Sequence, residues 1–240
     1  MSGEALSVLY RDGGLVIINK PSGMAVHRGW SQDRTTVLST LRDQLGCYVY
    51  PVHRLDRGAS GALLFALSGE LAARAQQALS AVDAIKNYLF LCRGILPARG
   101  IVDHAIAKSK AHEKRPARTA FERLHTFERY SVGAAALLTG RLHQIRRHMK
   151  HISHPLIGDT RYGKGEHNRL FRERVQLRRL VLHAYALSFR HPETAERLSI
   201  VAPPPGGLLE PLCELGAGAA ISEALGRGAW LPEPDWPQVE

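Results

Sequence analysis

The sequence has little cysteine, no long apolar run and no cofactor-binding motif. Its three cysteines, Cys47, Cys92 and Cys213, are scattered and form no C-x-x-C pair. This pattern argues against a disulfide framework and a cysteine-ligated zinc, and it favours a reducing compartment. No stretch approaches the roughly 18 consecutive apolar residues of a membrane span. The N-terminus has no basic region followed by an apolar run, so we expect no secretory signal and a cytoplasmic protein.

Several catalytic motifs are also missing. The pairs Gly13-Gly14 and Gly206-Gly207 lack the spacing of a dinucleotide or phosphate loop, and no Gly-x-Ser-x-Gly elbow occurs. The His-Glu-x-x-His pattern of zinc proteases is absent too. Four histidines raise the alternative of a histidine-metal hydrolase: His143, His148, His151 and His154. With no cysteine or acidic partner beside them, they are better read as hydrogen-bonding or phosphate-contacting groups, and the sequence predicts no metal and no cofactor.

Positive charge is concentrated in one third of the chain. The net charge of the 240 residues is +10, and 99–180 alone holds 19 Lys/Arg against 7 Asp/Glu. The remainder has 13 basic and 15 acidic residues and is nearly neutral. A polyanion such as RNA is the natural partner, because each neutralised phosphate releases condensed counterions. A basic surface that serves only solubility is the alternative.

Hydrophobic periodicity predicts mixed strands and helices. Strands are expected at 6–10, 15–19, 48–52, 62–67, 88–92, within 121–139, and at 180–189 and 198–202. Helices are expected at 35–45, at 70–82 with Ser68 as N-cap, and from Arg141 to about Ile152. The polar segment 99–118 reads as a long hairpin or mobile insertion. Without strict βαβ alternation, we predict an α+β fold with a largely antiparallel mixed sheet flanked by helices and loops.

The segment from His53 to Gly61 is the strongest candidate for chemistry. It places a carboxylate, Asp56, between Arg54 and Arg57, in a loop between two predicted strands. Neighbouring positive charge favours the ionised carboxylate, which can act as nucleophile or base. A purely structural ion pair is the alternative, since such pairs are common.

The predicted helix that opens at Thr139-Gly140 is the second candidate. Its first turn would offer unpaired N–H groups to phosphate, and its arginines could bind phosphate or hold a catalytic carboxylate. A solvated basic face is the alternative. Tyr88 and Tyr162 lie beside basic residues and could stack on a base, although core packing is the simpler reading. Residues expected to contact RNA from these two candidate segments are Arg57, Arg141, His143, Arg147 and Lys150.

Five ordered segments together resemble the RluA family of pseudouridine synthases. The segment VHRLDRGASG resembles the catalytic motif, KNYLFLCRG the second motif and TGRLHQIRRHMKHISHPLIGDTRYG the third. INKPSGMAVH and RLVLHAYALSFRHP fit before and after them. The resemblance implies a catalytic domain over 1–202 with a cleft for a flipped uridine. Residues 203–240 would form an extension with one short helix near 208–215 and a loose end.

The resemblance also implies residue roles. Asp56 would be the catalytic carboxylate, Tyr88 would stack on the uracil, and Arg146 would pair with Asp56. Arg54 would enter the RNA where the uridine leaves, and Leu182 would pack in the uracil pocket. The motif departs from the usual pattern at Gly58-Ala59, at Arg147 and at Ser153, none of which is a proposed catalytic position.

The implied reaction moves the ribose C1′ bond from N1 to C5 of uracil and needs no cofactor. Asp56 would either attack C1′ or remove a ribose proton, and both alternatives stay open. The pattern begins at Leu6, so no N-terminal S4-type RNA-binding domain is expected. The short start, VHRGW and the extended third motif resemble the branch that modifies uridine 65 of tRNA. A ribosomal RNA uridine, or a non-catalytic RNA-binding protein, are the alternatives; a monomer is the default.

Overall fold

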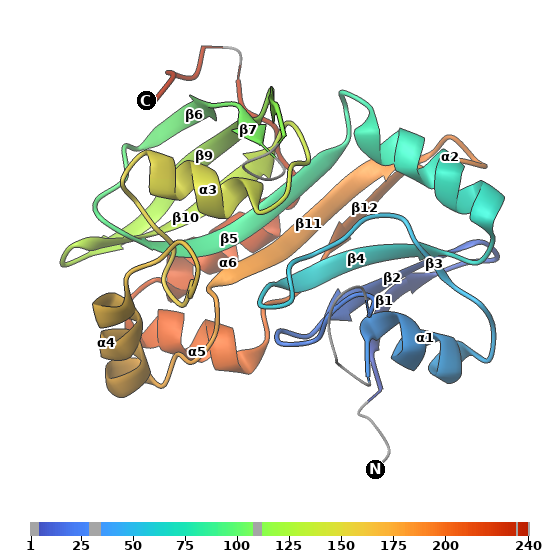
Figure 1. Ribbon diagram of the computed structural model, residues 1–240, viewed down its shortest axis with the longest axis horizontal. Helices are drawn as coiled ribbons and strands as arrows, with labels where there is room; N and C mark the ends of the chain where they lie inside the picture. Colours follow the sequence, from blue (N-terminus) through green and yellow to red (C-terminus); the bar gives the residue numbers. More distant parts are fainter. Residues whose placement is uncertain (1–4, 29–34, 108–111, 234, 240) are drawn as a thin grey trace.

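The protein is built on one large, mostly antiparallel sheet (Figure 1). The computed structural model describes residues 5–28, 35–107, 112–233 and 235–239. The sheet has ten strands, in the order β1-β2-β4-β11-β5-β10-β9-β6, with β12 beside β11 and β3 beside β4. These strands are β1 (Ser7–Arg11), β2 (Leu15–Lys20), β3 (Tyr50–Pro51), β4 (Ser60–Ala66), β5 (Ile85–Arg93), β6 (Arg99–Asp103), β9 (Arg118–Phe127), β10 (Tyr130–Leu137), β11 (Leu182–Arg190) and β12 (Arg197–Val201). The predicted mixed, largely antiparallel sheet is confirmed.

One parallel pairing joins the two halves of the sheet. β11 pairs with β4 in parallel through His183–Ser60 and Ala184–Gly61, and with β5 antiparallel on its other side. Gly61 makes this junction possible: its φ is +114°, and a Cβ built there would lie 2.2 Å from the Ala184 carbonyl oxygen. A side chain at this position would therefore push the two strands apart.

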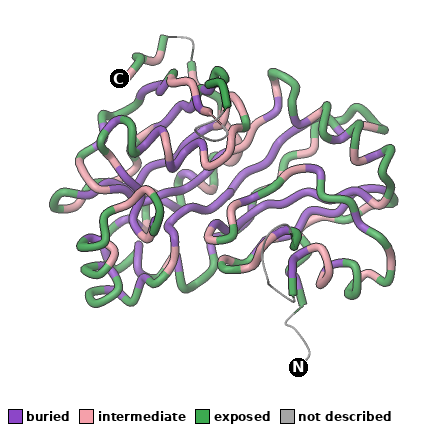
Figure 2. Tube along the Cα trace, in the orientation of Figure 1, coloured by how far each residue is buried: buried purple, intermediate pink, exposed green. Residues whose placement is uncertain are grey.

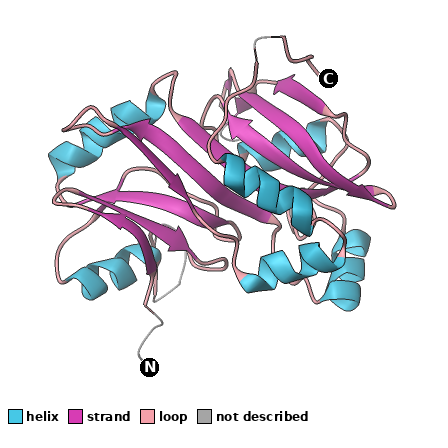
Figure 3. Ribbon diagram, turned by 180° about the vertical axis from the view of Figure 1, so that it is seen from behind, coloured by secondary structure: helices cyan, strands magenta, loops and turns pink. Residues whose placement is uncertain are grey.

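Helices cover both faces of the sheet. On one face, α1 (Val37–Leu45) and α3 (Gln144–His151) pack over alternate strand residues of one core cluster. On the other face lie α2 (Gly69–Ser80), α4 (Gly165–Val175), α5 (Gly206–Glu214) and α6 (Gly218–Arg227). Figures 1 and 3 show these two faces from opposite sides. The strands β2, β4, β5, β10 and β11 are buried through most of their length, while the outer helix surfaces are exposed (Figure 2).

The helices predicted at 35–45 and 70–82 are confirmed as α1 and α2. The Thr36 side chain accepts the N–H of Ser39, and Ser39 caps back onto Thr36, which forms a capping box at the start of α1. Gly46 ends that helix in the left-handed region at φ +68°. Ser68 caps α2 as predicted, because its hydroxyl accepts the N–H of Leu71.

The predicted start of the third helix is wrong. α3 begins at Gln144, not at Arg141, and His143 before it is left-handed at φ +53°. The Gln144 side-chain oxygen accepts the N–H of Arg141 and the hydroxyl of Thr139, so it ties the non-helical residues before it to the first residue of α3. The helix N-terminus therefore lies at His143-Gln144 and not at Thr139-Gly140, and its contact with phosphate stays a prediction.

Two helices were not predicted at all. α4 has polar and charged residues on most of its surface and buries only three side chains, so its periodicity is weak. α6 follows α5 after a short turn, and the expectation of a loose end after one helix is wrong for 218–227. The proposed domain boundary at residue 202 stays a prediction, although α5 and α6 share a core cluster with β5 and β10.

The basic segment 99–118 forms β6 and a short hairpin of β7 (Ile106–Ala107) and β8 (Lys114–Arg115). This agrees with the predicted hairpin, but residues 108–111 lie outside the described part of the chain. Gly29 and Trp30 of VHRGW lie outside it as well. Within the described chain, no helix combines the length and apolarity needed to cross a bilayer.

Candidate active site

The loop between β3 and β4 carries Asp56 and is fixed at both ends. The side chains of Leu55 and Ala59 are buried in the core, which leaves the Asp56 side chain between them at 16% exposure. The Ser22 hydroxyl donates to the carbonyl of Gly58 at 2.6 Å. The loop is thus a rigid support that presents one carboxylate at the protein surface.

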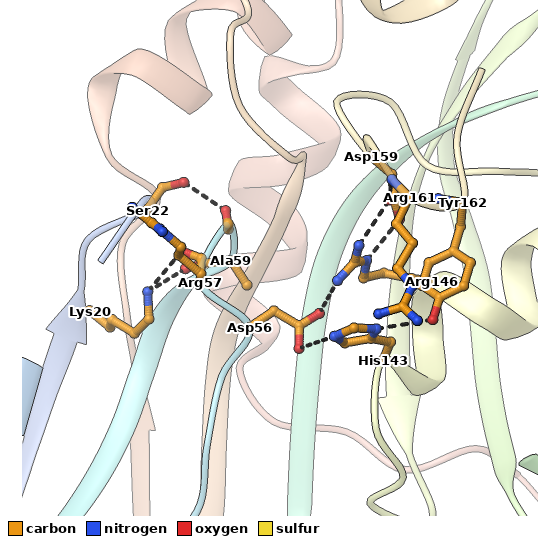
Figure 4. Close-up of polar contacts among 11 residues, drawn as sticks. Lys20, Ser22, Asp56, Arg57, Ala59, His143, Arg146, Asp159, Arg161 and Tyr162 are labelled. Atoms are coloured by element: carbon orange, nitrogen blue, oxygen red, sulfur yellow. Dashed lines mark hydrogen bonds and ion pairs between the residues drawn. The ribbon is translucent and has the colours of Figure 1, made fainter. Parts of the chain in front are cut away.

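The buried Lys20 forms hydrogen bonds to the backbone of the same loop. Lys20 is fully buried at the end of β2, and its Nζ donates to the carbonyls of Pro21 and Ala59 at 2.7 and 2.9 Å and to Arg57 at 3.3 Å (Figure 4). Burial, with the charge of nearby Arg179, lowers the pKa of Lys20 to about 7. Lys20 lies within INKPSGMAVH, and no role was predicted for it from the sequence.

Arg146 lies between two carboxylates (Figure 4). Its NH1 donates to Asp56 Oδ2 at 2.8 Å, while Nε and NH2 donate to the two oxygens of Asp159 at 2.8 and 2.9 Å. The Arg146 side chain is 11% exposed and that of Asp159 is fully buried. A planar guanidinium suits this double contact, because its donors point in fixed directions. The predicted pairing of Arg146 with Asp56 is present.

Asp159 anchors this arrangement. Its Oδ1 also accepts the backbone N–H groups of Arg161 and Tyr162, each at 2.9 Å. Burial by itself would raise the pKa of Asp159, but the hydrogen bonds from Arg146 and from the two backbone groups outweigh it and lower the pKa overall. Asp159 lies within the third motif, yet sequence reasoning gave it no role; its spacing of 13 residues from Arg146 carries no periodic signal.

His143 and Tyr162 lie next to Arg146 on the same side of Asp56 (Figure 4). His143 Nε2 lies 3.7 Å from Asp56 Oδ1, and its Nδ1 lies 3.1 Å from the Tyr162 hydroxyl. The Tyr162 ring faces the guanidinium of Arg146 at 5.1 Å, a cation–π distance. Tyr162 therefore packs on Arg146, the residue that binds the two carboxylates. From the sequence we considered only stacking on a base or core packing for Tyr162, so this contact was not predicted.

The Asp56 carboxylate opens into a cavity of about 1530 Å³. Tyr88 lines it from β5 and Leu182 from β11, both nearly buried. Burial, together with the charge of Asp56, raises the pKa of the Tyr88 phenol, so Tyr88 stays a neutral ring. The structure therefore brings together most of the predicted site residues around one cavity: Arg54, Asp56, Tyr88, Arg141, His143, Arg146 and Leu182.

Three predicted RNA-contacting residues are not among the described residues that line this cavity. Arg57 turns to the other side of the loop, where its Nε donates to the Gly23 carbonyl at 2.8 Å. Arg147 donates to the carbonyl of Ala107 and ties α3 to β7. Lys150 is exposed on α3, with its Nζ 5.9 Å from the Tyr162 ring. Any contact of these three with RNA would lie outside the cavity.

The four histidines do not converge. His148 is buried between Thr119 and the His104 carbonyl, and His154 bonds the Arg93 carbonyl. His151 instead stacks on the ring of His104. Over the described residues, no group of three or more His, Cys, Asp or Glu is arranged to hold a metal ion. For His148 and His154, these contacts agree with the predicted hydrogen-bonding role.

Comparison with known proteins assigns the family. The model of the RNA pseudouridylate synthase family matches residues 14–151, which is more than half of the chain. The chain belongs to this family. The resemblance of the ordered motifs to RluA-type enzymes is thereby confirmed, and the matched segment contains Asp56, Tyr88 and Arg146.

Relatives extend the likeness over most of the chain. A protein of Haemophilus influenzae named tRNA pseudouridine synthase C is 41% identical over 220 residues, covering 82% of this chain and 92% of its own. The protein of that name from Vibrio parahaemolyticus is 40% identical over 225 residues, covering 84% and 92%. Among solved structures, human RNA pseudouridylate synthase domain containing 1 superposes with a TM-score of 0.73 at 25% identity, covering 97% of this chain and 98% of that one.

Proposed function

We propose that this pseudouridine synthase isomerises a uridine of tRNA, at position 65, with Asp56 as its catalytic carboxylate. One observation supports this most: Asp56 is fixed by Arg146 at the wall of a cavity that also presents Tyr88 and Leu182. The names of relatives about 40% identical over most of the chain support tRNA as the substrate.

The cavity residues divide the work of the reaction. A base leaves the RNA stack at a cost of a few kcal/mol, which phosphate contacts can offset. The ring of Tyr88 would stack on the flipped uracil against Leu182, while exposed Arg54 at the cavity wall would contact the RNA. Arg146 would keep the Asp56 carboxylate aimed at the ribose, where it attacks C1′ or removes a ribose proton. The product has the same atoms and oxidation state as the substrate, so none of these steps requires a cofactor.

The test is to incubate the protein with unmodified tRNA transcripts and map pseudouridine at nucleotide resolution. We expect product at uridine 65 with the wild-type protein and none with Asp56→Asn, which keeps the shape but not the carboxylate. Asp43→Asn is the matched control, because Asp43 is 70% exposed and pairs only with its neighbour Arg42 among the described residues. Product with Asp56→Asn would disprove the assignment of Asp56.

The same assay separates the alternatives. Product in ribosomal RNA but not in tRNA would replace the substrate and keep the reaction. Binding of RNA without product, at protein amounts comparable to RNA, would favour a non-catalytic RNA-binding protein. For the binding itself we expect strong weakening with salt, since the basic segment 99–180 would displace counterions from phosphates. A cytoplasmic monomer stays our expectation, and light scattering tests the monomer.

A further inference from the structure

Isomerisation of uridine includes a proton transfer from C5 to N1 that the roles given above to Asp56 and Arg146 leave unassigned. This step rests on the proposed function. Once C1′ has moved from N1 to C5, the carbon C5 still carries its hydrogen and N1 carries none. Aromatic pseudouridine forms only when the C5–H bond breaks and N1 gains a proton. The site therefore needs a group that accepts a proton at one ring position and returns it at the other.

Most titratable side chains that line the cavity, among the described residues, are poorly suited to this task. Arginines stay protonated and cannot accept, and Tyr88 has a raised pKa. Lys86 donates to the Leu79 carbonyl, and His53 uses its Nε2 to accept the N–H of Leu64. His112 and Glu113 are exposed beside β8. His143 remains as the imidazole next to Asp56.

His143 is held in place by its backbone and by one hydrogen bond. It precedes α3 in the left-handed conformation, and its side chain is 16% exposed. One ring nitrogen meets the Tyr162 hydroxyl, while the other faces Asp56 Oδ1 at 3.7 Å (Figure 4). The second nitrogen thus lies beside the carboxylate at which C1′ is expected to react, and the migrating C5 comes to the same place.

Burial favours the neutral form of the His143 ring. Burial lowers its pKa most, Asp56 and the more distant Asp159 oppose this, and Arg146 and Arg161 add to it, with a net lowered pKa. The Tyr162 hydroxyl can donate to Nδ1 or accept from it, so Nε2 can carry a hydrogen or a lone pair. When Asp56 is charged, it favours a hydrogen on Nε2 of His143. When Asp56 is neutral, because it is bonded to C1′ or protonated, Nε2 can present its lone pair instead.

We propose that His143 carries the proton from C5 to N1 in the last step of the reaction. Nε2 takes the proton as the C5–H bond breaks, and that electron pair forms the C5=C6 double bond. The C6=N1 double bond shifts its electrons to N1, which takes the proton back from the imidazolium. One proton leaves C5, one reaches N1, His143 returns to its starting form, and nothing is oxidised or reduced.

Replacement of the C5 hydrogen by deuterium tests the role of His143 directly. The rate of product formation is measured with tRNA containing uridine or 5-deuterouridine, for wild type, His143→Asn and the control His151→Gln. Asparagine adopts the left-handed region readily but cannot carry a proton. We expect a loss of about 10²- to 10⁴-fold for His143→Asn, with an isotope effect larger than that of wild type and His151→Gln. A slow variant with an unchanged isotope effect would overturn the proposal.

A second analogue guards against a folding defect. 5-Fluorouridine has no hydrogen at C5, so its reaction stops after C1′ joins C5. We expect His143→Asn to form this fluorinated product as fast as wild type. With uridine as the substrate, we expect wild type to slow at low pH because His143 becomes protonated, and His143→Asn to lack this fall in rate. Loss of the fluorinated product as well would refute a role confined to the proton. Failure of wild type on both substrates would instead refute the proposed function.

Discussion

Replacement of the buried Asp159 by asparagine tests the structural contact of Arg146 with Asp159 separately from its contact with the catalytic candidate Asp56. Asp159 is fully buried and binds Arg146 through both oxygens, so Asp159→Asn removes a charge without changing the volume. The Asp56 contact to Arg146 is left in place. We therefore expect mainly a loss of stability.

The magnitude follows from the individual contacts. Removing one partner of a buried ion pair costs about 3–5 kcal/mol. Three of the four hydrogen bonds to the Asp159 side chain end on Oδ1, and the carbonyl oxygen of asparagine can keep them. The fourth, from Arg146 Nε to Oδ2, is lost, because two N–H groups then face each other. We expect the low end, about 3 kcal/mol, or roughly 6–12 °C in Tm for a chain of this size.

Urea unfolding followed by circular dichroism measures this loss, and its pH dependence identifies the cause. The lowered pKa of Asp159 means that its contribution is complete above the unfolded pKa of about 3.9. The contribution is lost as pH falls through the lower folded value. The difference between wild type and Asp159→Asn should therefore shrink in acid.

Asp43→Asn is the matched control, because its exposed pair is worth at most about 1 kcal/mol. A loss for Asp159→Asn no larger than that of the control at pH 7 would refute the reasoning. So would a difference from wild type that stays constant down to pH 3.

Three further predictions concern the supports of the site. Arg146→Lys should lower the rate of pseudouridine formation far more than Arg147→Lys, because one ammonium cannot replace a guanidinium that binds two carboxylates. Gly61→Ala should cost about 2–5 kcal/mol in urea unfolding, from overpacking and a strained φ, whereas Gly13→Ala meets no atom within 4 Å and should be nearly neutral. The pKa of Lys20 is about 7 in the folded protein and about 10.4 in the unfolded chain, so the free energy of unfolding should rise between pH 7 and about 10. Lys20→Met should flatten this rise, and an unchanged slope would contradict the lowered pKa.

The fold was predictable where local signals are strong. The apolar periodicity of 35–45 and 70–82, the N-cap Ser68 and the apolar strands predicted α1, α2 and most of the sheet. α3 was misplaced because Gln144 satisfies the preceding backbone with its side chain, and a pattern of charged residues does not reveal that contact. α4 was missed because it buries only a few residues, so tertiary packing rather than periodicity defines it.

The sequence predicted the reactive residues of the site, but not the buried charged residues that hold them in place. The motifs identified Asp56, Tyr88 and Arg146, and the structure places all three at one cavity. Lys20 and Asp159 were missed, because a buried charge looks like any surface charge in a sequence. Only the fold shows that each is enclosed and fully hydrogen-bonded.

The two carboxylates on Arg146 show how one arginine can serve structure and reactivity together. In the sequence, the arginines beside Asp56 suggested a structural ion pair, but the structural carboxylate is Asp159. Asp159 is enclosed and accepts four hydrogen bonds, which leaves it no capacity to react. Asp56 accepts one hydrogen bond from Arg146 on Oδ2, while Oδ1 faces the cavity beside His143. Because Asp159 fixes the guanidinium, the single hydrogen bond to Asp56 is enough to aim it, and Oδ1, which Arg146 does not bind, stays available for the ribose.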